Sequence, residues 1–209
     1  MRLLDPSVRA ELRGLAPDTA EATALQLVAA GLLVDEEPAR ALEHARAARS
    51  IAARIGAVRE AVGVAAYHAG EWAEALSELR AARRIGGDPQ WIAVMADAER
   101  ALGRPERALR ALQDKDLSSV DAATRTEVYI VAAGARRDLG QLDAALMLLE
   151  QAGARSMTPR AGISRLWYAY ADALAGAGRV DEAVRWFQAT AALQEDETDA
   201  EERLASLGR

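Results

Sequence analysis

The chain of 209 residues contains no cysteine and has few aromatic side chains from which a large core could be built. Without cysteine there is no disulfide framework, no thiol nucleophile and no thiolate-bound zinc or iron–sulfur site. Only 4% of the residues are aromatic although 51% are hydrophobic, so much of the apolar fraction is alanine, which favours helix and buries little area. We therefore expect an elongated chain whose segments pack on their neighbours.

Long hydrophobic runs and clusters of lysine are missing as well. The richest apolar stretch, residues 25–34, falls short of the roughly 18 residues that a membrane-spanning helix needs. The first residues, MRLLDPSVRAELRGL, carry charges every few positions where a signal peptide would be apolar. The formal net charge is -6 and Lys115 is the sole lysine, so no basic stripe is available for phosphates. These features predict a cytoplasmic protein that binds neither membrane nor nucleic acid.

Prolines and glycines divide the sequence into helical stretches. Prolines suit the first turn of a helix, and glycines suit the left-handed position just after its end. Apolar residues between them recur at intervals of three and four and never alternate over a strand length, so we expect an all-α fold. The prolines that precede helical stretches are Pro6, Pro17, Pro38, Pro89, Pro105 and Pro159. The predicted helices span residues 6–14, 18–33, 38–52, 57–69, 72–84, 89–102, 105–113, 121–139, 142–152, 160–176, 180–193 and 197–207.

An internal repeat becomes visible when the sequence is aligned on four glycine turns. The aligned segments are GEWAEALSELRAA, GRPERALRALQDK, GQLDAALMLLEQA and GRVDEAVRWFQAT, which begin at Gly70, Gly103, Gly140 and Gly178. An earlier copy, DEEPARALEHARAA, has Glu36 in place of the glycine. Each copy has an alanine five residues after the turn position: Ala41, Ala75, Ala108, Ala145 and Ala183. Each copy also has a small residue seven positions before the turn position: Ala29, Gly63, Ala96, Ala133 and Ala171.

This pattern resembles the tetratricopeptide repeat, a helix-turn-helix unit of 34 residues in which small side chains let two helices approach closely. The resemblance covers about residues 22–193, and the chain as a whole resembles tetratricopeptide proteins of high-GC bacteria. It implies an all-α, right-handed solenoid of about five repeats in a single domain, residues 1–209. An N-terminal helix is expected within residues 1–20 and an acidic capping helix within 195–209, where Leu204 and Leu207 would dock. The polar connection at 114–123 is the expected place for a bend.

The resemblance also implies how the protein acts. First helices line the concave face of such a solenoid, so the chain is expected to be a non-catalytic scaffold that binds a protein or peptide there. Any single residue of that face is more often solvated or packed for structural reasons than involved in partner binding. The lysine and asparagine with which family members grip chaperone tails are absent. The expected partner-binding residues are Glu60, Tyr67, His68, Asp97, Arg100, Arg137, Tyr168 and Asp172.

Other functions remain as alternatives. Apolar patches on the terminal repeats could form a homodimer, and an enzyme or a nucleic-acid-binding regulator is less favoured. His44 and His68 are the only histidines, HExxH and phosphate-loop motifs are absent, and His44 is expected on the surface. We therefore expect no catalytic residue, cofactor or metal.

The arginine clusters of the second helices are expected to form ion pairs on the convex side. Glu99 and Arg136 stand where the family usually has a packed tyrosine.

Overall fold

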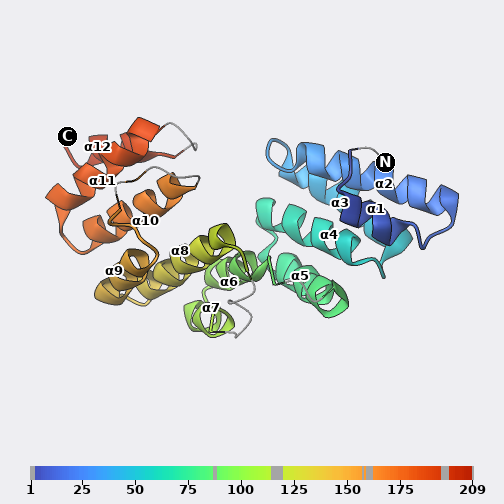
Figure 1. The fold of residues 1–209 in the computed structure, drawn as a ribbon, viewed down its shortest axis with the longest axis horizontal. Helices are drawn as coiled ribbons and strands as arrows, with labels where there is room; N and C mark the ends of the chain where they lie inside the picture. The colour runs from blue at the N-terminus through green and yellow to red at the C-terminus, as the bar shows by residue number, and fades with distance from the viewer. Residues whose placement is uncertain are drawn as a thin grey trace. The chain divides into compact units, whose positions relative to one another are not determined.

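The computed structural model describes residues 3–86, 89–113, 120–156, 158, 162–193 and 198–208, and these residues form twelve α-helices and no strand (Figure 1). The helices follow the predicted stretches in order, so the prediction of an all-α chain is confirmed. Their bounds are α1 Pro6–Leu12, α2 Pro17–Leu33, α3 Pro38–Ala52, α4 Gly56–His68, α5 Trp72–Gly86, α6 Ile92–Ala101, α7 Pro105–Ala111, α8 Ala122–Asp138, α9 Leu142–Gln151, α10 Ile163–Gly176, α11 Val180–Leu193 and α12 Ala200–Ser206. Within the described part of the chain, no helix is long and apolar enough to cross a membrane.

The chain divides into two compact units, residues 1–103 and residues 104–209. In the first unit, α2 packs on α3, α3 on α4, α4 on α5 and α5 on α6, while α1 lies against both α2 and α4. In the second unit, each helix from α7 to α12 packs on the next one along the chain. Consecutive packing is what a repeat of helix pairs requires, because each pair buries its apolar face on its neighbours. The single domain over residues 1–209 stays a prediction, and most of the expected bend at 114–123 lies outside the described residues.

Helix starts agree with the predicted ones except at three places, two of which follow a proline. Proline is the first residue of α1, α2, α3 and α7, and the Asp5 carboxylate accepts a hydrogen bond of 2.8 Å from the Ser7 backbone N–H. α6 begins at Ile92 and not at residue 89, because residues 89–92 form a separate turn in which the Ile92 N–H donates to the Pro89 carbonyl. α10 begins three residues later than predicted, after Gly162 at φ +71°. The start of α12 is likewise Ala200 and not residue 197.

The glycine turns and the repeated alanines adopt the geometry that the repeat predicts. All four turn glycines have positive φ, between 72° and 77°, which side chains other than glycine rarely tolerate. At the first of them the Glu71 N–H donates to the Ala66 carbonyl, which closes the end of α4. Ala41, Ala75, Ala108, Ala145 and Ala183 are all 0% exposed. These alanines therefore lie where helices meet.

The first helices supply the other side of this contact. A Cβ atom added at Gly63 would lie 2.5 Å from Leu79 Cγ, so α4 and α5 approach more closely than an alanine would allow. Ala96, Ala133 and Ala171 are buried in the same way. In the α2–α3 pair the prediction is one residue off: Ala30 is buried, whereas Ala29 is half-buried. This pair lacks the glycine turn, and α2 instead runs on into a right-handed cap at Val34.

Candidate partner-binding surface

In the first unit, three of the predicted residues form one hydrogen-bonded set between α4 and α6. The Tyr67 hydroxyl donates to Asp97 Oδ2 at 2.6 Å, and the Arg100 guanidinium donates to Asp97 Oδ1 at 2.7 Å. The Tyr67 ring packs edge-on against Trp72 of α5, with the ring centroids 5.3 Å apart. The side chains of Asp97 and Arg100 remain 28% and 20% exposed. This set, the Tyr67 cluster, is thus held by its own contacts and still reaches solvent.

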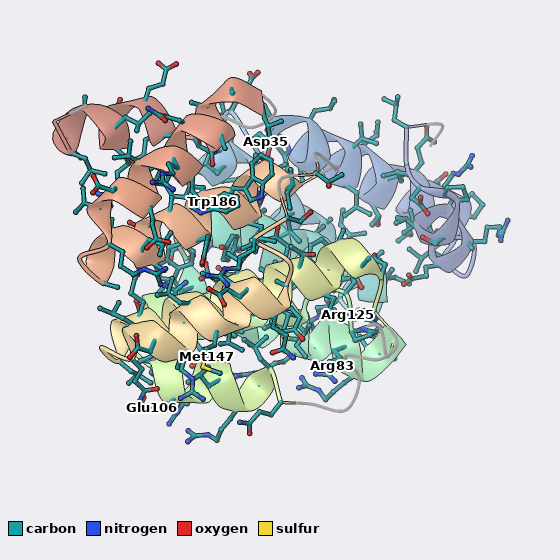
Figure 2. All side chains as sticks on the ribbon, turned by 60° about the vertical axis from the view of Figure 1, so that its left-hand side comes forward. Asp35, Arg83, Glu106, Arg125, Met147 and Trp186 are labelled. Carbon is teal, nitrogen blue, oxygen red and sulfur yellow. The ribbon has the colours of Figure 1, made fainter. Side chains whose placement is uncertain are left out.

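Glu60 and His68 share α4 with Tyr67, and the His68 ring packs edge-on against the Tyr67 ring, with the centroids 5.9 Å apart. His68 is exposed, and its Nδ1 lies 3.8 Å from Oδ1 of Asp35, which Figure 2 labels beside the end of α2. Glu60 is half-buried. His44, which was expected on the surface, is half-buried, and its Nδ1 lies 2.7 Å from the side-chain oxygen of Gln26.

In the second unit, the remaining predicted residues meet across α8 and α10. Arg137 of α8 forms an ion pair with Asp172 of α10, whose side chain is 20% exposed. One turn earlier on α10, the half-buried Tyr168 packs edge-on against the fully buried Phe187 of α11, with the centroids 5.4 Å apart. The sequence therefore predicted three residues that the structure places side by side.

Two residues of this surface were not predicted, and both belong to α12 or its cap. The Tyr168 hydroxyl donates to Asp199, and the Arg203 guanidinium donates to Asp172 at 2.5 Å. Arg203 also lies over the Phe187 ring, 5.7 Å from its centroid. The signal in the sequence was the single arginine within an acidic segment, four residues after Asp199. As expected, Leu204 and Leu207 pack against the core of this unit.

Burial and the neighbouring carboxylate change the acidity of Tyr168. Removal of the phenol from water raises its pKa, and the hydrogen bond to Asp199 raises it further, to about 12 from an ordinary value of 10.0. The cations Arg203 and Arg137 act in the opposite direction but do not cancel this effect. Tyr168 is therefore a neutral hydrogen-bond donor at physiological pH.

The second helices carry ion pairs, as the sequence predicted, while their position on the convex side stays a prediction. Glu78 of α5 is buried and binds two arginines, Arg49 of α3 at 2.6 Å and Arg59 of α4 at 2.7 Å. Glu99, which stands where a tyrosine was expected, is 3% exposed and accepts a bond of 2.5 Å from Arg80. A buried carboxylate held by arginine thus replaces the ring. Among the described residues, no group of three or more acidic or histidine side chains is placed to hold a metal ion.

Aromatic side chains gather on the side of α10 that faces away from Tyr168. Trp186 of α11, labelled in Figure 2, is half-buried, with its ring centroid 5.8 Å from that of Trp167 and 5.5 Å from that of Tyr170. The Trp167 indole N–H donates to the Ser156 carbonyl, and the Tyr170 hydroxyl donates to Glu150. These contacts fix the orientation of α10 and, with it, the positions of Tyr168 and Asp172.

Comparison with known proteins identifies the fold. No protein-family model and no curated protein sequence matches the chain. A solved structure of PilF from Pseudomonas aeruginosa is similar, with a TM-score of 0.64 and 15% sequence identity over 91% of this chain and 90% of that chain. The fold is tetratricopeptide-like. The predicted helical-solenoid fold class is thereby confirmed, while the resemblance to proteins of high-GC bacteria stays a prediction.

Proposed function

We propose that this protein is a non-catalytic interaction scaffold that binds a peptide or protein segment on the first helices of its repeats. The observation that carries the proposal is the Tyr67 cluster, in which α4 and α6 present a tyrosine, a carboxylate and a guanidinium together at a solvent-accessible position. The tetratricopeptide-like fold supports it, because folds of this kind typically serve as scaffolds for protein partners. Catalysis, cofactor binding and nucleic-acid binding are not part of the proposal, and the expected cytoplasmic location stays a prediction.

The chemistry of the Tyr67 cluster suits an extended or helical peptide. Arginine presents five N–H donors in a planar fork, a geometry that suits carboxylates and backbone carbonyls. Tyrosine adds a large apolar face that loses little conformational entropy on binding. Arginine and tyrosine are also the residue types that contribute most binding energy at protein interfaces.

The test is a peptide selection against the full chain. Peptides selected from a random display library are measured for binding to the wild type and to the double variant Tyr67→Ala/Arg100→Ala. We expect the selected peptides to lose at least about tenfold in affinity, the effect of about 1.4 kcal/mol. The control is Arg40→Ala, which removes an exposed arginine of α3. Selected peptides that bind a folded double variant as tightly as the wild type would refute the proposal.

A second candidate function is self-association, and α2 favours it. Leu25 and Leu32 lie seven residues apart on this helix and are 62% and 72% exposed. Spacing by seven places both leucines on the same face of α2, while Leu27 and Ala30 of the same helix are buried in the core. Light scattering of the wild type and of Leu25→Gln/Leu32→Gln over a range of concentrations tests this candidate. A wild type that stays monomeric throughout would exclude it.

A further inference from the structure

The short helix α12 contacts the second unit through polar as well as apolar side chains. Asp199 at its N-terminal end accepts from Tyr168, and Arg203 donates to Asp172 and lies over Phe187. α12 thereby covers Tyr168 and Asp172, two of the residues that the sequence assigned to partner binding. Figure 1 shows α12 in red beside α11. The chain itself thus provides a ligand for this surface.

The apolar part of this contact is small. Of the residues of α12 only Ala200 is buried, and Leu204 and the C-cap residue Leu207 are half-buried. A helix of seven residues is not stable alone in water, and partly exposed ion pairs contribute little. Arg203 Nε is buried, and no described residue accepts its hydrogen, which makes the contact weaker than a fully paired one. These features describe a ligand that another one can displace.

We propose that the surface under α12, formed by Arg137, Tyr168, Asp172 and Phe187, is a binding site for a partner helix, and that α12 occupies it as a displaceable internal ligand. The partner helix carries a carboxylate and, four residues later, an arginine. This spacing places both groups on one helix face, as Asp199 and Arg203 are placed in α12. The inference rests on the proposed function, since it names the partner chemistry of one part of the interaction surface.

Each group of the surface selects one group of the partner. Tyr168 is a neutral donor that requires an acceptor, which a carboxylate supplies. Asp172 is flanked by Arg137 on one side and accepts a second guanidinium on the other. The Phe187 ring offers its face to the same cation. A partner helix that runs in the direction of α12 with acid and base in reversed order would place its carboxylate against Asp172, and like charges would oppose binding.

The experiment uses the full chain and a fluorescent peptide of residues 198–208. In the released variant, Asp199→Ala/Arg203→Ala, the internal helix loses both polar contacts. The control variant Glu201→Ala/Glu202→Ala changes two exposed residues of the same helix. We expect the peptide to bind the released variant at least about tenfold more tightly than the wild type or the control. The reason is that the apparent affinity is the intrinsic affinity multiplied by the fraction of molecules whose site is not occupied by α12. An added Asp172→Ala change is expected to abolish this gain.

Hydrogen exchange distinguishes release from unfolding. In the released variant we expect faster exchange of the amides of residues 200–206 and unchanged protection of α10 and α11. Equal peptide affinity in the wild type and the released variant, binding that survives Asp172→Ala, or lost protection in α10 and α11 would each overturn the proposal. The peptide selection above depends on Tyr67 and Arg100 in the other unit, so its result stands apart from this one.

Discussion

The first and last helices of the chain, α1 and α12, each have seven residues, but they differ in how they are held against their neighbours. α1 in the first unit is held by apolar burial: Leu12 is 0% exposed and Val8 packs against the same core. Its Glu11 carboxylate also accepts a hydrogen bond of 3.1 Å from the Ala57 N–H and so caps the start of α4. α12 in the second unit buries only the small Ala200, half-buries Leu204, and adds hydrogen bonds and an ion pair to Tyr168 and Asp172.

This difference separates a fixed element from a displaceable one. Apolar burial stabilises in proportion to the area removed from water and is not weakened by screening. Partly exposed ion pairs are weak and are screened by salt. A partner can supply the same hydrogen bonds that Asp199 and Arg203 make, and so can replace α12. The hydrogen bonds of a partner cannot replace the buried side chain of Leu12. Helix length therefore does not decide whether α1 or α12 is fixed or displaceable. The kind of contact that each helix makes decides it.

The strongest test removes the apolar anchor of α1. Leu12→Ala is expected to lower the free energy of unfolding by about 2–5 kcal/mol, because it leaves a cavity in a closed core. The matched control is Leu3→Ala, since Leu3 is 78% exposed and its loss is expected to change stability by about 0.5 kcal/mol or less. Urea unfolding measures both. Equal, small effects of the two substitutions would show that α1 is not fixed by burial.

The helix seams provide the next test. Ala133 and Ala171 show that the second unit accommodates a methyl group at this position, whereas at Gly63 a Cβ would meet Leu79 at 2.5 Å. Gly63→Ala is therefore expected to destabilise by about 1–3 kcal/mol through overpacking.

A glycine with free space nearby is the control for that substitution. Gly31 lies in α2, and an added Cβ there meets no atom within 4 Å. Gly31→Ala is expected to stabilise by up to about 1 kcal/mol, the gain in helix propensity. Thermal unfolding that shifts in the same direction for both variants would contradict the close approach of α4 and α5.

The sequence was sufficient to predict the helices and the contacts between them. Gly70 and Gly178 marked turns, and Ala75 and Ala183 marked helix contacts, because backbone conformation and close approach each require a particular small residue. Ala29 was predicted in place of Ala30 because the first copy has no glycine to set the register.

The candidate surface was predictable only in part. Tyr67, Asp97 and Arg100 follow from helical spacing within and between repeats. Asp199 and Arg203 do not, because their contacts depend on how α12 packs against α10, and no repeat pattern extends to α12. An acidic segment by itself indicates a solvated face, so its role in covering Tyr168 becomes visible only in three dimensions.

A smaller effect is expected from salt. Arg203→Ala should lower the free energy of unfolding by about 1 kcal/mol or less, because the Arg203 and Asp172 side chains are 37% and 20% exposed. Raising the salt concentration is expected to speed hydrogen exchange in α12 of the wild type and to leave α1 unchanged. In Arg203→Ala the response of α12 to salt should diminish. Equal responses of α1 and α12 in the wild type would remove the distinction between them.

The finest distinction comes from alkaline pH, because the Tyr168 phenol that bonds to the N-cap of α12 can titrate. The pKa of Tyr168 is raised from 10.0 to about 12, first by burial and then by the bond to Asp199, so the unfolded chain loses this proton before the folded one does. The stability that Tyr168 contributes is therefore complete below pH 10 and is lost as the pH rises toward 12. Urea unfolding between pH 9 and about 11 is expected to show a shallower decline in Tyr168→Phe than in the wild type. Asp199→Ala should lie between them, because burial of the phenol remains. An unchanged decline in Tyr168→Phe would mean that this hydroxyl does not help to hold α12.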